Sequence, residues 1–170
     1  MGARNESSRL VSSRQRGFGL IEAMVAMVVL SVGLLGLAAL QAAGARANYN
    51  AYLHSQAAMI SLDLFERIRG NPDGAYAIGM NAGLPLAAAD CQGAGTNCDA
   101  ETLARYDLVF LKCALGKFSG ADTCVNNNYQ GQLPSGDASV VVNGDDYILT
   151  IQWFDSADNA IKTFVFNATI

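Results

Sequence analysis

The chain has 170 residues, of which 51% are hydrophobic, and its formal net charge is −4 at pH 7. This length favours one domain with an appendage over two separate domains. From Phe18 onward the sequence holds 7 basic and 14 acidic residues. An acidic balance of this kind counts against sequence-independent nucleic-acid binding, which needs clustered Lys and Arg.

The first 17 residues form a polar segment with four arginines and one glutamate. Basic residues ahead of an apolar segment orient the N-terminus toward the cytoplasm. We therefore expect the acidic remainder of the chain to lie on the other side of a membrane.

The next segment is apolar and long enough to cross a bilayer. No charged residue occurs from Ala23 to Leu40, and these 18 residues span about 27 Å as a helix. Glu22 stands directly before them. A charged group inside a bilayer costs about 2.5–3.5 kcal/mol on insertion scales. A simple membrane anchor gives no reason for this carboxylate.

One long helix is predicted over residues 18–70, because no proline interrupts them and Gly70 and Pro72 supply a stop signal. At 1.5 Å per residue it would be about 80 Å long. Its second half is amphipathic, with apolar residues at near-helical spacing: Leu53, Ala57, Ile60, Leu64 and Ile68.

A loop over residues 71–98 and a second helix over residues 100–117 follow. Asp99 or Asn97 is the expected N-cap of this helix. Its predicted apolar stripe consists of Leu103, Tyr106, Phe110, Leu111 and Ala114. Residues 116–137 have the composition of another loop.

The C-terminal part alternates in the manner of β-strands. Strands are predicted at 138–143, 146–154 and 160–170, with a hairpin turn at Asn143-Gly144. The predicted fold is therefore α+β, with a three-strand antiparallel meander packed on the upper half of the long helix.

Four cysteines lie on the translocated side of the chain, and an even count there indicates two disulfides. Pairing within the two local pairs closes short loops at low entropic cost. We therefore favour Cys91–Cys98 and Cys113–Cys124, although the sequence alone leaves three connectivities.

No metal, cofactor or catalytic site is predicted. The cysteines lack the CxxC spacing of a zinc site, and the single histidine, His54, is expected to be structural rather than catalytic. Asp145-Asp146 and the segment 155–159 lack the EF-hand pattern. Without a phosphate loop, nucleophile elbow or carboxylate pair, an enzymatic function is not expected.

Three interpretations compete for residues 14–41. The first is a plain single-pass anchor. The second is a secretory signal peptide cleaved after "ARA" at 45–47, but the apolar run exceeds the usual 7–15 residues and an acid within it is unusual. The third rests on the sequence "RGFGLIEAMVAMVVLSVGLLGL", which resembles the class III signal of type IV prepilins and pseudopilins.

That signal has a short basic leader, a Gly before the cleavage site, a Phe that begins the mature chain and a Glu at its fifth position. Gly17, Phe18 and Glu22 match these positions, while Gly19 replaces the usual Ser or Thr. The resemblance implies cleavage between Gly17 and Phe18 by a prepilin peptidase, and N-methylation of Phe18.

Later segments resemble the PilV class of minor pilins, also described as type IV pilus modification proteins. The matching pieces are "DLFERIRGNP" at 63–72, "YDL" at 106–108 and "WFD" at 153–155. The chain departs from this class at Phe110 and Leu111, where the class tends to have Glu-Trp.

This resemblance implies a division into a cleaved leader (1–17), a transmembrane and assembly half of the long helix (18–43) and a periplasmic globular pilin domain (44–170). The implied function is a minor pilin that primes assembly of the type IV pilus and supports twitching motility and adhesion. The implied partners are other minor pilins, the major pilin, the inner-membrane assembly platform and a tip adhesin. Two alternatives stay open: a minor pseudopilin of a type II secretion system, and a DNA-uptake or adhesin module.

The resemblance also gives a reason for Glu22. Cleavage would leave a cationic amine on Phe18, and in a polymer Glu22 can pair with the N-terminal amine of a neighbouring subunit. A buried carboxylate is costly unless it is paired, so the pairing would select correctly docked subunits. The alternative is that Glu22 reaches the cytoplasmic headgroups on its own.

Overall fold

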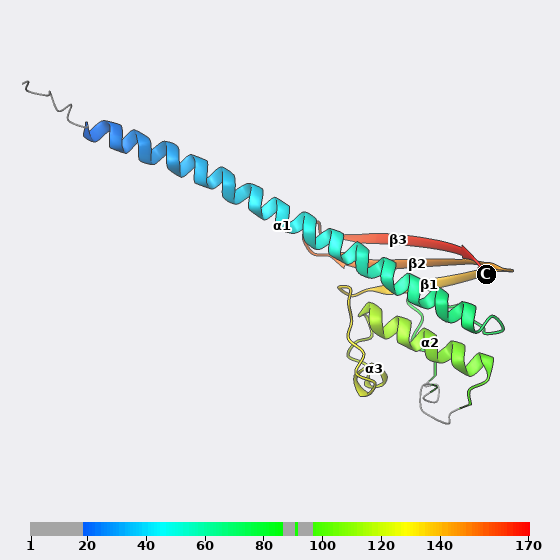
Figure 1. The fold of residues 1–170 in the computed structure, drawn as a ribbon. Helices are drawn as coiled ribbons and strands as arrows, with labels where there is room; N and C mark the ends of the chain where they lie inside the picture. The colour runs from blue at the N-terminus through cyan, green and yellow to red at the C-terminus, as the bar shows by residue number, and fades with distance from the viewer. Residues whose placement is uncertain (1–18, 87–90, 92–96) are drawn as a thin grey trace, which may run out of the picture. The chain divides into compact units, whose positions relative to one another are not determined.

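The computed structural model describes residues 19–86, 91 and 97–170, and these form an α+β fold (Figure 1). The chain divides into two compact units, one ending at Gly44 and the other beginning at Ala45. The described elements, in chain order, are α1 (Leu20–Gly70), α2 (Ala100–Leu115), α3 (Asp122–Asn126), β1 (Asp137–Asn143), β2 (Asp146–Asp155) and β3 (Ala160–Thr169).

Helix α1 is continuous from Leu20 to Gly70, close to the predicted range, and Arg67 and Arg69 lie in its last turn. Cations there interact favourably with the partial negative charge at a helix C-terminus. The five apolar positions predicted for its second half are all buried, and Ser61 and Phe65 are buried with them. The Ser61 hydroxyl donates to the Ala57 carbonyl at 2.7 Å, so its burial leaves no unpaired donor.

The sheet is an antiparallel meander in the order β1-β2-β3. Asn143 pairs with Asp146, so the hairpin loop consists of Gly144 and Asp145. The predicted turn at Asn143-Gly144 was therefore wrong by one residue. Gly144 has a φ of +63°, and a glycine at the first loop position is typical of type II′ hairpins.

One face of the sheet carries the core, and the period-two alternation of β2 explains which face. Tyr147, Leu149, Ile151 and Trp153 are all buried, and they share one cluster with the buried face of α1 from Leu53 to Ile68. The outer edge of β1 is partly covered, since Ile78 of the preceding loop pairs with Val140 in both directions at 3.0 and 2.8 Å.

Helix α2 is shorter and more enclosed than predicted. It ends at Leu115, because Gly116 adopts the left-handed conformation that terminates it. The predicted apolar stripe was wrong in part: Leu103 and Phe110 are only partly buried, whereas Asp107 and Lys112 are buried. Helix α3 falls in a segment predicted to be loop, and its five residues are too short for a helical period to be visible.

Gly116 lies where three chain segments meet at close range. Its φ is +116°, and a Cβ there would collide with the Leu133 carbonyl oxygen, a backbone atom that cannot rotate away. Gly116 also forms a parallel bridge with Gly136. The left-handed conformation and the missing side chain are therefore both required at this position.

We predict that Gly116→Ala lowers the free energy of unfolding by about 2–4 kcal/mol, through backbone strain and overpacking. Urea unfolding of the full chain in detergent micelles, followed by fluorescence of the single buried tryptophan, Trp153, measures this change. Gly120→Ala is the matched control, since no atom lies within 4 Å of its added Cβ. Equal unfolding midpoints for the two variants would contradict the claim that position 116 requires glycine.

Candidate functional site

The N-terminal half of α1 is an apolar helix whose side chains lack cover within the described residues. All 13 large apolar residues from Leu20 to Leu40 are at least 53% exposed. This stretch is apolar and long enough to cross a membrane, and none of it is buried within the structure. Burying one such side chain is worth about 1.5–3 kcal/mol. The segment therefore requires lipid or other helices around it.

Glu22 is the only charged residue from Leu20 to Gly44. It lies in the first turn of α1, where the Gly19 carbonyl accepts the amide hydrogens of Glu22 and Ala23 at 2.9 and 3.3 Å. An acidic side chain is favoured at a helix N-terminus by the helix dipole. The predicted cleavage residues, Gly17 and Phe18, lie outside the described residues.

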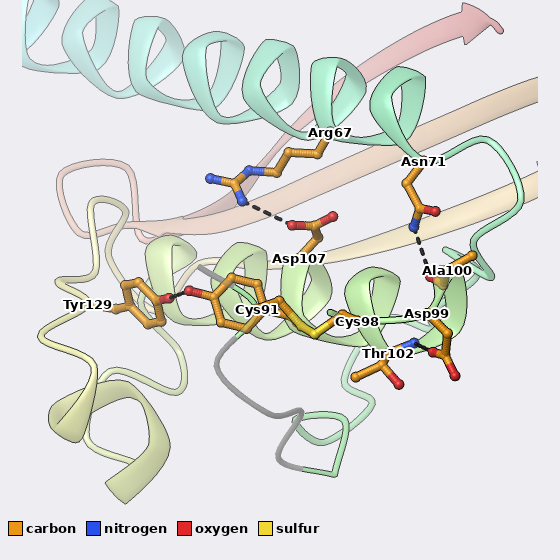
Figure 2. The surroundings of a disulfide bond; sticks show 10 residues. Arg67, Asn71, Cys91, Cys98, Asp99, Ala100, Thr102, Asp107 and Tyr129 are labelled. Atoms are coloured by element: carbon orange, nitrogen blue, oxygen red, sulfur yellow. Dashed lines mark hydrogen bonds and ion pairs between the residues drawn. A yellow bond between two sulfur atoms is a disulfide. The ribbon is translucent and has the colours of Figure 1, made fainter. Parts of the chain in front are cut away.

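The end of α1 is joined to α2 by an ion pair in the head, the unit that begins at Ala45. Arg67 donates through Nη1 to Asp107 Oδ1 at 3.0 Å and through Nε to Asp63 Oδ2 at 3.1 Å. Its guanidinium carbon also lies 4.3 Å from the centre of the Phe110 ring. Figure 2 shows Arg67 reaching from α1 to Asp107 on α2. Partial burial opposes its charge, but these two carboxylates hold the pKa of Arg67 above its ordinary value.

A second set of hydrogen bonds continues from Asp107 to the loop after α1. The Tyr76 hydroxyl donates to Asp107 Oδ2 at 2.8 Å, and Asn71 Nδ2 donates to the Tyr76 oxygen at 3.1 Å and to the Ala100 carbonyl at 2.8 Å. Burial, reinforced by Asp107, raises the pKa of Tyr76 well above its usual value, although the hydrogen bond from Asn71 opposes this. Tyr76 therefore stays a neutral donor.

Another carboxylate, Asp137, joins the other end of α2 to the sheet. Its Oδ1 accepts from Lys112 Nζ at 2.5 Å and from the Ala138 amide at 2.8 Å. Its Oδ2 accepts from Lys117 Nζ at 3.0 Å and from the Asn81 amide at 2.9 Å. Burial favours the neutral acid, yet the bonds from the two lysines hold the pKa of Asp137 below its usual range.

Both disulfides have the connectivity that the sequence analysis favoured. The Cα–Cα distance is 5.8 Å for Cys91–Cys98 and 5.4 Å for Cys113–Cys124. Cys98 directly precedes Asp99, whose side chain accepts the Thr102 amide hydrogen at 2.8 Å and caps α2 (Figure 2). The first disulfide therefore joins Cys91 to the residue before the N-cap of α2, and the second ties α2 to α3.

His54 packs on the sheet and has no catalytic neighbourhood among the described residues. Its ring meets the Trp153 ring edge-on, with the ring centres 4.9 Å apart. No group of three or more His, Cys, Asp or Glu side chains that could hold a metal ion occurs in the part of the chain that the structure describes. The described residues therefore form an internally bonded head and present an uncovered apolar helix.

Three residues that organise the head were not predicted from the sequence: Tyr76, Lys112 and Asp137. The only available signal was the position of Lys112 between apolar residues in "VFLKCALG". A lysine on that face is normally solvated, and its acceptors come from segments 25 to 33 residues away.

Comparison with known families places two matches end to end. Residues 12–38 match the prokaryotic N-terminal methylation motif, and residues 39–109 match type IV pilin Tt1218. No curated protein matches the chain. No solved structure matches it either.

We predict that Asp107→Ala destabilises the head by about 3 kcal/mol, because it leaves Arg67 and Tyr76 without their shared acceptor. The Asp107 side chain is only 4% exposed, so water cannot replace the carboxylate easily. The measurement is the urea midpoint of the full chain in micelles. Glu101→Ala removes the exposed Glu101–Arg105 pair and is expected to change stability by less than about 0.5 kcal/mol. A loss no larger than this control would show that the network is not stabilising.

Proposed function

We propose that the chain is a pilus component, and within the pilus a minor pilin of the PilV class, because a match to the prepilin methylation motif is followed directly by a match to a type IV pilin. In this role it is incorporated in small numbers and helps to prime assembly of the type IV pilus. Through the pilus it contributes to twitching motility and adhesion.

The observation that carries this proposal is the bare apolar half of α1 with Glu22 as its one charge. Such a helix first needs a membrane and then a bundle of similar helices, because its exposed side chains must be buried in either setting. A membrane alone gives no advantage to a carboxylate. A bundle of helices with free N-terminal amines gives the carboxylate an oppositely charged partner.

The steps of maturation follow from this assignment. A prepilin peptidase removes residues 1–17, and the new N-terminus at Phe18 is methylated. Residues 18–43 hold the protein in the inner membrane, with residues 44–170 in the periplasm. The assembly platform then transfers the subunit into the pilus, where it joins other minor pilins, the major pilin and an adhesin near the tip.

One network in the head supports the assignment to the PilV class. The Arg67, Asn71 and Asp107 positions that carry the resemblance in sequence are linked through Tyr76 into one hydrogen-bonded chain. Matching residues in a sequence are more informative when they act together in the fold. The network fixes the end of α1 against α2.

Processing gives the first test of the proposal. We expect the membrane form to begin at Phe18, because Gly17 stands at the cleavage position of the motif. Substituting Gly17 by Leu is expected to leave the leader attached, since a bulky residue obstructs the peptidase. N-terminal sequencing of both forms measures this. A start near Ala47, or an intact Met1 in the wild type, would refute the pilin assignment.

Assembly gives the second test. We expect Glu22→Ala to leave insertion and cleavage intact, because removing a charge from the apolar segment does not oppose insertion. Recovery in sheared pili is expected to fall, because the pairing that selects docked geometry is lost. Glu22→Gln is expected to behave like Ala, since the amide keeps the shape of the side chain without its charge.

Two outcomes would give Glu22 a role other than pairing, and a third would assign the protein to another assembly. Wild-type recovery of both variants would mean that the carboxylate only reaches the headgroups. Loss of cleavage would assign Glu22 to recognition by the peptidase. Recovery with the components of a type II secretion system instead of the pilus would replace the minor pilin by a minor pseudopilin.

A further inference from the structure

A cleft of about 500 Å³ opens at the end of the sheet where β1 begins, β2 ends and β3 begins. The loop after α1 and the residue after the C-cap of α2 complete its walls. Its lining combines polar and apolar side chains, among them Met80, Lys117, Ser135, Gln152, Phe154 and Ile161. Neither the assembly segment nor the Arg67–Asp107 network contributes to it.

The polar side of this cleft has more positive than negative charge. Lys112 has three donors, and all three are used by Asp137 Oδ1 and the carbonyls of Gly79 and Ala138. Asp137 accepts four hydrogen bonds, two on each oxygen, so its acceptor capacity is filled. Two lysines therefore share one saturated carboxylate, which leaves a net charge of about +1.

Lys117 is the solvent-accessible lysine of the two. Its ammonium donates to Asp137 Oδ2 at 3.0 Å and to Asn81 Oδ1 at 2.5 Å, and its side chain is 35% exposed. The third N–H has no acceptor among the described residues. The Phe118 ring centre lies 5.6 Å from the ammonium and gives an attraction that neutralises no charge.

The opposite side of the cleft is apolar. Phe154 is 40% exposed and Ile161 is 67% exposed, and the two are direct partners across β2 and β3. Ser135 and Gln152 line the same space and can donate further hydrogen bonds. The cleft therefore combines a lysine that shares its carboxylate with a second lysine, additional donors and an apolar wall.

We propose that this cleft binds an acidic side chain, flanked by apolar residues, on a neighbouring subunit of the pilus. The partner's carboxylate accepts from Lys117 and Ser135, and its apolar neighbours cover Phe154 and Ile161. The choice of an anion follows from charge complementarity in a head that is otherwise acidic. The identity of the partner as a pilus subunit rests on the function proposed above.

The test uses the full chain, isotope-labelled in zwitterionic micelles, and two synthetic peptides. One is acetyl-Ser-Leu-Glu-Leu-Ser-amide, and the other has Gln in place of Glu. We expect the Glu peptide to shift the NMR signals of Ser135, Gln152, Phe154 and Ile161. The Gln peptide is expected to bind about fivefold more weakly, the size of one partly exposed ion pair.

Variants of the lysines make the test specific. Lys117→Gln is expected to weaken binding of the Glu peptide by the same factor, and Lys117→Arg to retain it. Asp137 keeps Lys112 in both variants, so the fold is expected to persist. The control is Arg105→Gln, because Arg105 is 44% exposed, pairs with Glu101 on α2, and neither residue lines the cleft. That variant is expected to bind like the wild type.

Three results would overturn the proposal: no shift in the cleft up to the solubility limit of the Glu peptide, equal binding of both peptides, or unchanged binding by Lys117→Gln. None of these readouts depends on cleavage, membrane insertion or recovery in pili. A negative result here therefore leaves the minor pilin assignment intact, and failure of that assignment leaves carboxylate binding by the cleft measurable.

Discussion

The uncovered apolar half of α1 is the constraint on which the rest of the protein depends. Thirteen large apolar side chains from Leu20 to Leu40 lack cover within the described residues, and the one charge among them is a carboxylate. Water disfavours the apolar surface, and a bilayer disfavours the charge. A bundle of similar helices with cationic N-termini satisfies both, and this is the setting that we propose for the segment.

The head, which begins at Ala45, pairs its buried charges within its own unit. Asp107 and Asp137 each accept from several donors on different elements, and each joins α2 to another part of the head. A buried pair adds less stability than its close contacts suggest, but losing one partner is costly. These networks therefore specify one arrangement of α1, α2 and β1. The charges matched inside the head contrast with Glu22, which has no salt bridge to another described residue and for which we propose a partner on another chain.

Much of this fold could be predicted because its periodicities are long and regular. The buried positions of α1 follow a helical repeat from Leu53 to Ile68, and β2 alternates over ten residues. The short helix α3 and the hairpin offset at Gly144 depend on one or two residues, which no periodicity reveals. Burial of Lys112 depends on distant carbonyls. The contact of the Phe110 ring with the Arg67 guanidinium likewise joins residues that lie far apart in the sequence. The cleavage site at Gly17-Phe18 stays a prediction from sequence.

The central claim is that Glu22 pairs with the N-terminal amine of a different subunit. Zero-length carbodiimide coupling in intact sheared pili tests it most directly, because the reagent joins a carboxylate to an amine only when the two are in contact. Mass spectrometry is predicted to find the peptide that contains Glu22 joined to the N-terminal peptide of another pilin. Coupling of Glu22 only to the amine of Phe18 in its own chain, or no coupling in pili that contain the protein, would contradict the claim.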